Sequence, residues 1–188
     1  MELSTLEVPT NIGDNYGSRV RGYLCVPATG NYFFWIASDD TGELWLSTDE
    51  NPINKTRIAY VSGWTHPRQW DKYPSQRSAA RSLVAGRKYY FEALLKEGTG
   101  GDHLSVGWQL PNGTLERPIS GARLTKFGSE TACYGTGTVQ NERWTGIPGR
   151  DISSIPVTSP PSSVSNISSL EVPTHIGDNY GSRVRGYL

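Results

Sequence analysis

Two adjacent aspartates, Asp39 and Asp40, are the residues in this sequence whose type and spacing best suit metal chemistry. They follow a run of strand-forming residues and precede Thr41 and Gly42. Neighbouring residues of a strand point to opposite faces, so both carboxylates can reach one ion only if the backbone between them is distorted. Calcium, a hard cation that takes about six to eight oxygen ligands, is the ion that such a pair would suit. The alternative is a tight turn, in which the aspartates bond to their own backbone and Gly42 adopts a positive φ.

A second polar loop could complete the coordination of a calcium ion. Residues 96–103, with the sequence KEGTGGDH, are rich in glycine and are expected to connect two core strands. Asp102 is a candidate side-chain ligand, and the carbonyl oxygens of Gly100 and Gly101 are candidate backbone ligands. The alternative is an ordinary glycine-rich hairpin in which Asp102 is a turn residue.

Aromatic side chains near these loops could contact a ligand held by the ion. An aromatic ring would pack on the apolar face of such a ligand. The loop at residues 63–76 offers Trp64, Trp70 and Tyr73 for that ring, and His103 is a further candidate contact. At least one of the three aromatic rings is expected to cover the end of the core instead.

The sequence shows no recognisable catalytic motif. It contains neither GxSxG nor a Walker-type loop. Glu92 and Glu97 share a strand region, but a glycosidase needs two carboxyl groups roughly 5–10 Å apart across a cleft, and no motif indicates one. The three histidines are scattered without the spacing of zinc ligands. We therefore expect a binding module and not an enzyme.

Short segments of alternating apolar and polar residues predict the strands that position these loops. Residues 30–38 are apolar on both faces, as in a central strand, and Leu104, Val106, Trp108 and Leu110 share one face of another strand. Such strands, separated by turn residues, favour an all-β antiparallel sandwich or barrel with long loops and little helix. The expected strands cover residues 18–26, 30–38, 42–47, 56–63, 77–84, 87–97 and 103–110.

Charge and hydropathy exclude two classes of partner. The chain of 188 residues has 18 Lys and Arg and 18 Asp and Glu, so its net charge is zero. Nucleic acids and anionic membranes are recognised by basic patches, which this sequence does not offer. No apolar stretch approaches the roughly 18–20 residues of a membrane-spanning helix, so we expect no membrane insertion.

The sequence contains a domain-length repeat. Residues 4–24 recur at 168–188 with only Thr5 replaced by Ser169 and Asn11 by His175. A spacing of this length is typical of tandem domains and far exceeds that of solenoid repeats. Neighbouring modules of the same parent chain are therefore expected partners.

The two cysteines, Cys25 and Cys133, fit neither a metal knuckle nor a CxxC redox motif. They could form a disulfide in a secreted protein. Leu188 corresponds to Leu24, so an equivalent of Cys25 would come next in the array. Cys133 could form its disulfide with that cysteine instead of with Cys25.

Residues 30–118 strongly resemble the PA-14 domain family, most closely its bacterial multi-domain arrays. The resemblance is weaker for RWTGIPG at 143–149, which is similar to the opening strand of the family, and for the duplicated EVPTNIGDNYGSRVRGYL segment. The stretches that carry it are GNYFFWIASDDTGELWLSTDENP at 30–52, GWTHPRQWDKYPSQRSA at 63–79, GRKYYFEALLKEGTGGDHLSVGWQLPNG at 86–113 and ERPI at 116–119.

The resemblance implies an antiparallel β-sandwich and a function. Many members of the family bind glycans through calcium, and in these a cis peptide between two aspartates points both carboxylates at the ion. It therefore favours the calcium site over the simple turn. The implied function is a non-catalytic, calcium-dependent carbohydrate-binding module of a secreted, extracellular or cell-surface protein. The alternatives are a structural spacer or adhesin module without sugar binding, and an accessory domain of a secreted glycoside-active enzyme.

The order of segments in the family also implies domain boundaries. Residues 1–124 resemble a module without its opening strand, 125–142 a linker, and 143–188 the N-terminal part of a second module. We expect residues 140–148 to fold back onto the first module, because an open sheet edge invites another strand. Residues 168–188 are then expected to be exposed, loosely docked or swapped into another chain.

Overall fold

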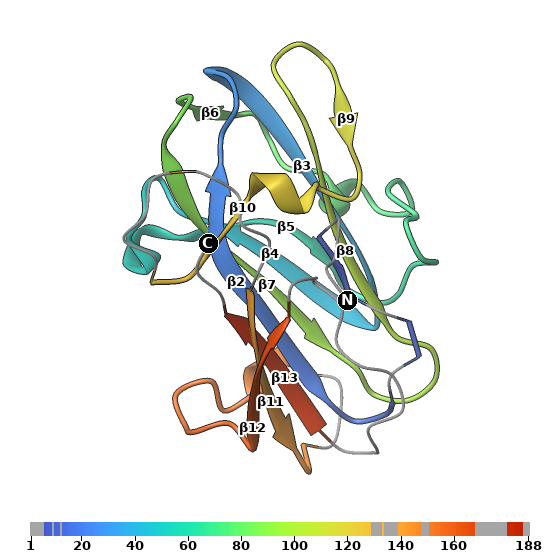
Figure 1. The fold of residues 1–188 in the computed structure, drawn as a ribbon. Coiled ribbons are helices and arrows are strands. Elements are labelled where there is room, and N and C mark those ends of the chain that lie inside the picture. Colours follow the sequence, from blue (N-terminus) through green and yellow to red (C-terminus); the bar gives the residue numbers. More distant parts are fainter. Residues whose placement is uncertain are drawn as a thin grey trace.

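The computed structural model describes residues 6–8, 10–11, 13–128, 133, 139–147, 151–167 and 180–185 (Figure 1). The described part is built of β-strands and of single turns of 3₁₀ helix, η1 (Pro52–Asn54), η2 (Pro74–Gln76), η3 (Gly121–Arg123) and η4 (Ile152–Ser154). The strands are β1 (Glu7–Val8), β2 (Gly17–Cys25), β3 (Gly30–Asp39), β4 (Thr41–Leu46), β5 (Thr56–Val61), β6 (Arg81–Leu83), β7 (Lys88–Lys96), β8 (His103–Gln109), β9 (Leu115–Glu116), β10 (Leu124–Lys126), β11 (Val139–Thr145), β12 (Ser163–Ile167) and β13 (Tyr180–Arg185).

The strands form two sheets. The first has the order β1-β8-β3-β6, with β9 beside β8, and the second has the order β12-β11-β13-β2-β7-β4-β5, with β10 beside β2. The pairings are antiparallel except that between β13 and β2, which is parallel. One hydrophobic core contains residues of both sheets, including Phe34 and Trp108 from the first and Leu44 and Phe91 from the second. The predicted antiparallel β-sandwich with little helix is confirmed.

The core follows from side-chain alternation along the strands. Leu104, Val106, Trp108 and Leu110 all belong to the core, as their shared face predicts. The expected strand at 77–84 is shorter, because only Arg81–Leu83 forms β6. Before it, the hydroxyl oxygen of Ser78 accepts a hydrogen bond from the backbone N–H of Phe34, where a regular ladder would use a backbone carbonyl.

The segment after residue 124 is held against β2. Cys25 and Cys133 form a disulfide with their Cα atoms 5.3 Å apart, within the usual range for such a bond. Phe127 stacks on Tyr23, with ring centroids 6.0 Å apart. Part of the expected linker at 125–142 therefore lies in strands, because β10 ends at Lys126 and β11 begins at Val139.

Strand β11 pairs in the same register with both copies of the repeat. Arg143 is opposite Ser18 in β2 and opposite Ser182 in β13, which are equivalent positions of the two copies. Arg143 and Trp144 thus reach β2, within the range 140–148 that we expected to fold back onto the first module.

The position of β13 differs from the sequence prediction. Residues 182–185 pair in parallel with 18–21, so β13 lies in the sheet beside β2. The expectation that the second copy stays outside the sheet is therefore wrong for residues 180–185. The physical reason is that β2 beyond its pairing with β10 offers backbone groups that another strand can satisfy. Residues 168–179 and 186–188 lie outside the described residues.

Candidate metal centre

Two crossings between the sheets bring the candidate ligands together. Asp39 ends β3 in the first sheet, and Thr41 begins β4 in the second. The loop of residues 97–102 makes the reverse crossing, from β7 to β8. Because Asp39 is opposite His103 and Thr41 is opposite Lys96, the two crossings lie side by side. The peptide bond between Asp39 and Asp40 is cis.

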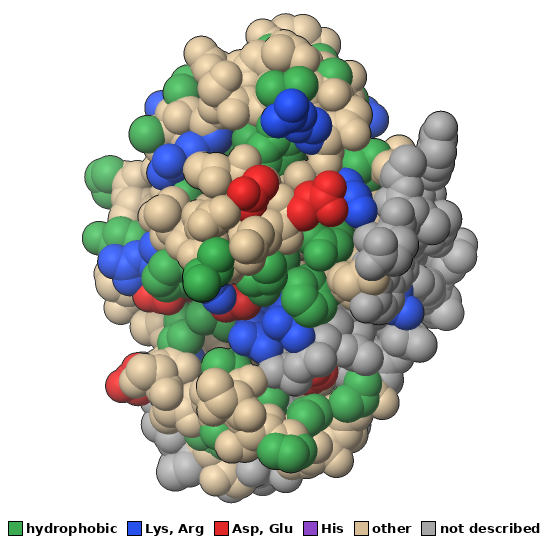
Figure 2. Space-filling model, turned by 90° about the vertical axis from the view of Figure 1, so that its left-hand side faces the viewer, with side chains coloured by type: hydrophobic (Ala, Val, Ile, Leu, Met, Phe, Trp, Pro, Cys, Tyr) green, Lys and Arg blue, Asp and Glu red, His purple; other side chains and the backbone are tan. Residues whose placement is uncertain are grey.

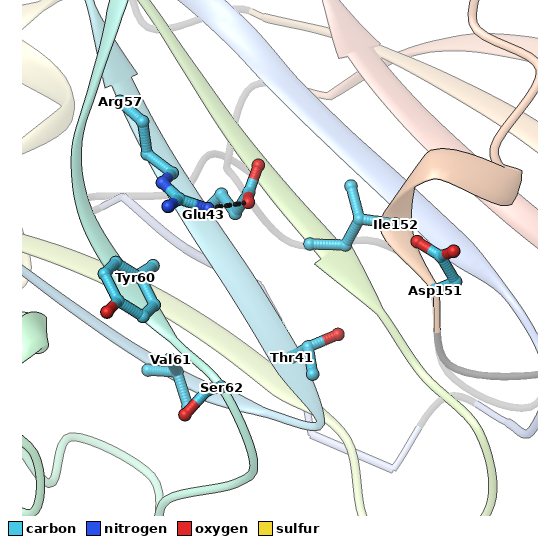
Figure 3. Close-up of a pocket in the computed structure, with 8 residues that line it drawn as sticks. All are labelled: Thr41, Glu43, Arg57, Tyr60, Val61, Ser62, Asp151 and Ile152. Carbon is cyan, nitrogen blue, oxygen red and sulfur yellow. Dashed lines mark hydrogen bonds and ion pairs between the residues drawn. The ribbon is translucent and has the colours of Figure 1, made fainter.

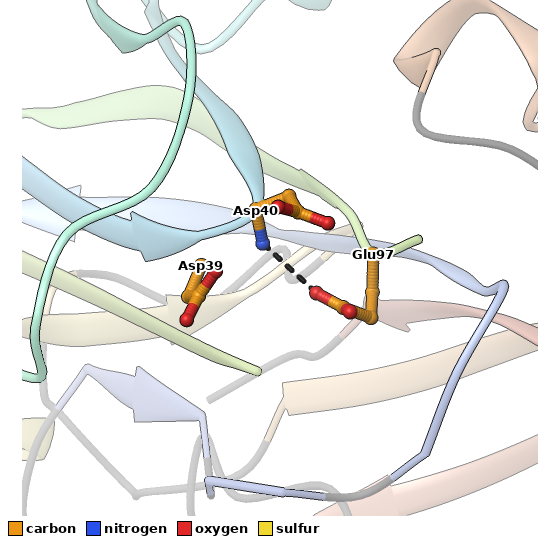
Figure 4. Close-up of side chains that lie close together, drawn as sticks. All are labelled: Asp39, Asp40 and Glu97. Carbon is orange, nitrogen blue, oxygen red and sulfur yellow. Dashed lines mark hydrogen bonds between the residues drawn. The ribbon is translucent and has the colours of Figure 1, made fainter. Parts of the chain in front are cut away.

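Three carboxylates meet at these crossings. Asp39, Asp40 and Glu97 each place one oxygen within 4.8 Å of the other two (Figure 4). The backbone N–H of Asp40 donates to Oε2 of Glu97 at 2.9 Å, and the N–H of Gly98 donates to Oδ2 of Asp40 at 2.9 Å. Asp40 and Glu97 are buried and Asp39 is half-buried. The backbone therefore holds this acidic cluster, defined as Asp39, Asp40 and Glu97, in place.

The pKa of Glu97 is strongly raised. Burial and then the charges of Asp40, Asp102 and Asp39 together raise it to about 8, against the lowering effect of the Asp40 N–H. Its Oε1 atom is buried without a hydrogen-bond partner among the described residues. A buried carboxylate among like charges takes either a proton or a cation. The donor set and this oxygen fit a hard cation such as calcium.

Asp102 holds a third segment against the cluster. Its Oδ2 accepts a hydrogen bond from the N–H of Gly13 at 2.9 Å, and its backbone carbonyl accepts one from the N–H of Asn11 at 2.9 Å. The N–H of Asn15 donates to the carbonyl of Gly98. The structure thus places Asp102 at the join between the 97–102 loop and the segment around residues 11–15.

The two predicted glycines lie at the same join. The N–H of Gly100 donates to Oδ1 of Asp14 at 2.9 Å. A Cβ atom on Gly101 would stand 3.3 Å from Oδ1 of Asn11 and 3.5 Å from Oδ2 of Asp39. Gly101 therefore leaves open a space between an amide oxygen and a carboxylate oxygen, which a side chain would fill.

Sequence reasoning missed Glu97 and Asn11 as oxygen donors of the site. Glu97 is the last residue of the predicted strand at 87–97 and directly precedes the glycines of the loop, which is a detectable signal. Asn11 lies about ninety residues from that loop in the chain, and only the fold brings the two together. Its φ of 60° is one that asparagine tolerates better than most residues.

Thr65 anchors the aromatic loop beside the acidic cluster. Its N–H donates to the carbonyl of Ser38 at 2.8 Å, and its Oγ1 accepts from the N–H of Ser38 at 3.1 Å. Its own carbonyl lies 2.9 Å from Nε2 of His103. Trp64 directly precedes Thr65 and is 45% exposed, with Nζ of Lys72 3.3 Å from its ring centroid. Of the three predicted aromatic contacts, Trp64 is therefore the one that is exposed to solvent.

The other predicted sugar contacts are less exposed. Tyr73 is partly buried and packs against the core. Trp70 is half-buried, with the guanidinium of Arg117 5.9 Å from its ring centroid. His103 is buried, which lowers the pKa of its imidazole, and its ring faces Thr65. Tyr73 and His103 thus stabilise the fold of the loop, Tyr73 through the core and His103 through Thr65.

Glu92, the other glutamate of the glycosidase alternative, lies in a separate ionic cluster. Its carboxylate accepts hydrogen bonds from Lys55 at 2.9 Å and from Tyr90 at 2.7 Å, and pairs with Arg19 at 3.5 Å. Glu92 and Glu97 therefore do not form a pair of facing carboxylates.

Charged side chains of both signs lie on the surface (Figure 2), and the described helices are single turns. On the face shown in Figure 2, acidic and basic side chains are interspersed and form no patch of a single sign. Within the described ranges, no helix is long and apolar enough to span a membrane.

A comparison with known protein families shows which family the chain belongs to. The PA14 domain family matches residues 2–122. The chain belongs to the PA14 domain family. The resemblance of the sequence to that family is thereby confirmed, while the bacterial tandem-array origin stays a prediction.

The PA14 chain is similar to segments of much longer proteins. It is 44% identical over 125 residues to N-acetyl-beta-glucosaminyl-glycoprotein 4-beta-N-acetylgalactosaminyltransferase 1 of Mus musculus, over 63% of this chain and 12% of that protein. It is 30% identical over 114 residues to fibrocystin of Canis lupus familiaris, over 57% of this chain and 3% of that protein. The chain thus spans only a small part of these relatives.

Two solved structures of Candida glabrata adhesin domains are also similar. The epithelial adhesin 6 A domain, in complex with Galb1-3GlcNAc, has a TM-score of 0.43 and 15% identity over 63% of this chain and 54% of that one. A subtype-switched epithelial adhesin 9 A domain, in complex with beta-lactose, has a TM-score of 0.41 and 18% identity over 54% of this chain and 46% of that one.

Proposed function

We propose that this PA14 domain is a non-catalytic module that binds carbohydrate through a calcium ion held by the acidic cluster. The observation that carries the proposal is the placement of Asp39, Asp40 and Glu97, whose carboxylate oxygens lie within 4.8 Å of one another. The buried Oε1 of Glu97 has no hydrogen-bond partner among the described residues, so a cation would satisfy it.

The candidate ligand atoms of the cluster are carboxylate oxygens, which suits calcium. Asp39, Asp40 and Glu97 would hold the ion, and the carbonyls of Gly100 and Gly101 remain candidate ligands from the sequence. Oδ1 of Asn11 lies beside Gly101 and adds a neutral oxygen. When bound, the calcium ion supplies coordination positions for two vicinal hydroxyls of a sugar.

The protein's own side chains would orient that sugar. Trp64 is exposed next to Thr65, which is bonded to the strand that ends at Asp39. Lys72 lies over one face of its ring, which fixes the indole. The other face of the indole would then pack on the apolar face of a sugar. Asp102 acts in this proposal by holding the 11–15 segment.

The setting of the module follows from its disulfide and its family. A disulfide such as Cys25–Cys133 persists in oxidising compartments. We therefore place the module outside the cell or on the cell surface, with an extracellular glycan as its partner and neighbouring modules of the same chain beside it.

Thermal unfolding and glycan binding test the proposal together. We expect calcium to raise the melting temperature of the wild type and not that of Asp39→Asn/Asp40→Asn. Lactose, added as the first probe, should bind the wild type more tightly in calcium than in chelator. Asp71→Asn, which changes an exposed aspartate outside the cluster, is the matched control. A spacer module without sugar binding would show no calcium effect in any of the three proteins.

A further inference from the structure

A groove lies on the outer face of the second sheet, away from the core. Its volume is about 330 Å³, and its floor is formed by β4 and β5. Figure 3 shows Thr41, Glu43, Arg57 and Tyr60 on the two strands, with Asp151 and Ile152 of the η4 region across from them. The groove is thus lined by β5 and the η4 region, which are about ninety residues apart in the sequence.

Strand alternation explains why these residues face the groove. Leu44 and Leu46 of β4 point into the core, so Thr41 and Glu43 lie on the opposite face. In β5 the core takes Val61, and the neighbouring Tyr60 is 38% exposed. Apart from Val61, which belongs to the core, the residues that line the groove are therefore not needed to fill it.

The basic side chain of the groove is held in position by its neighbours. Nη1 of Arg57 donates to Oε1 of Glu43, whose Oε2 accepts a hydrogen bond from Nε1 of Trp45 at 3.0 Å. The guanidinium of Arg57 lies 4.5 Å from the ring centroid of Tyr60. Arginine has five N–H donors, and the bond to Glu43 uses one of them. The Arg57 side chain is 45% exposed, so the groove offers oriented donors to a ligand.

The opposite wall supplies acceptors and an apolar contact. Oδ1 of Asp151 accepts a hydrogen bond from the N–H of Ser153 at 2.8 Å, which fixes the carboxylate at the start of η4. Asp151 is exposed to solvent, and Ile152 beside it is half-buried. The two walls together present an arginine, two carboxylates, a threonine hydroxyl and the edge of an aromatic ring.

This combination suits a polar, uncharged ligand. Two carboxylates and one guanidinium disfavour phosphates and other anions. The volume is at the low end of the range of about 300–1,000 Å³ for small-molecule sites, which suits one or two sugar rings better than a large cofactor. Hydroxyl groups can donate to the carboxylates and accept from the arginine.

We propose that the groove is a second saccharide site, which takes a neutral sugar and needs no calcium. No residue that lines it belongs to the acidic cluster. Thr41 directly follows Asp40, so the groove and the acidic cluster share the β3–β4 connection. Two sites on one module would raise the avidity for a branched or densely displayed glycan.

An array of neutral glycans, probed in chelator, tests the groove independently of the metal centre. We expect the wild type to retain binding in chelator, and Asp39→Asn/Asp40→Asn to match it. Tyr60→Ala and Asp151→Asn, which act from opposite walls, should each weaken that binding about tenfold. Ile53→Ala is the control, because Ile53 is 83% exposed and does not line the groove.

The outcomes separate the two sites. Equal glycan binding by the wild type in calcium and in chelator would overturn the calcium-dependent function and support the groove. The groove proposal is overturned if the wild type binds no neutral glycan in chelator. It is also overturned if both groove variants bind as well as the wild type, since both exposed positions leave the core intact.

Discussion

The N–H of Asp40 donates a hydrogen bond to Oε2 of Glu97 at 2.9 Å and so ties the β3–β4 connection to the end of β7. This bond points the remaining Glu97 oxygen, Oε1, into a buried position among acidic neighbours. The two residues are far apart in the sequence, so the acidic cluster exists only in the folded chain.

Replacement of Glu97 by glutamine tests its role as a cation ligand. Glutamine keeps the shape and an oxygen acceptor for the Asp40 N–H but removes the charge. We expect Glu97→Gln to lower calcium affinity at least about tenfold, which corresponds to about 1.4 kcal/mol. Calorimetric titration with calcium measures the affinity of the wild type and of the variant. Glu50→Gln, which changes an exposed carboxylate of the surface, should bind calcium like the wild type.

The raised pKa of Glu97 predicts a pH dependence of stability in the absence of calcium. Its pKa rises from 4.5 to about 8, chiefly through burial, so the folded state binds the proton more tightly than the unfolded state. This contribution is fully present below about pH 4.5 and is lost as the pH rises toward about 8. His103 acts in the opposite direction, since burial lowers its pKa and its contribution is lost as the pH falls below 6.5.

The difference between wild type and Glu97→Gln isolates the glutamate from the histidine. Urea unfolding in chelator between pH 5 and pH 8.5 should show wild-type stability falling relative to that of the variant. Parallel stability curves for the two proteins would contradict the assigned electrostatics.

Gly101 should be sensitive to the smallest side chain. In Gly101→Ala the new Cβ would stand 3.3 Å from Oδ1 of Asn11 and 3.5 Å from Oδ2 of Asp39, so it would crowd the Asn11 oxygen and fill the space between the two oxygens. We expect calcium affinity to fall several-fold while the melting temperature in chelator changes little. Thr99→Ala, at an exposed position of the same loop, is the control. Equal calcium affinity in the two variants would show that the space beside Gly101 is not part of the site.

Trp64 should affect sugar binding and not ion binding. Its side chain is exposed and belongs to neither the core nor the acidic cluster. We expect Trp64→Ala to weaken glycan binding at least about tenfold, or about 1.4 kcal/mol, with unchanged calcium affinity. Trp70→Ala serves as the comparison. A variant that loses both affinities together would instead indicate a structural role for Trp64.

The segment after β11 should stabilise the sandwich. Trp144 and Ile155 are buried, and a Cβ on Gly17 of β2 would stand 2.0 Å from Cγ1 of Ile155. Truncation of a buried isoleucine to alanine costs about 2–5 kcal/mol. We expect Ile155→Ala to lower the free energy of unfolding by an amount in this range, measured by chemical denaturation. Val164→Ala, at an exposed position, is the control, and equal stability of the two variants would show that the segment is only loosely attached.

The sequence alone predicted the sandwich because its strands carry strong local signals. Leu104, Val106 and Trp108 recur on one face, and that pattern depends only on neighbours in the chain. The aspartate pair and the glycine-rich loop were found in the same way, from residue types and turn chemistry.

The remaining parts of the site depend on contacts between distant segments. Asn11 reaches Gly101 only because Asp102 binds the backbone of the 11–13 segment. The groove requires η4 to lie across from β4, and no local pattern predicts that contact. The place of β13 was mispredicted because the two copies have nearly the same sequence, and Arg143 pairs at equivalent positions of both.

Calorimetric titration with calcium chloride tests the central claim most directly. The account predicts one calcium site in the wild type and none in Asp39→Asn/Asp40→Asn, with the same fold for both proteins by circular dichroism. Absence of a calcium-binding signal in the wild type, or equal binding by the wild type and the variant, would contradict the assignment of the acidic cluster as a metal centre.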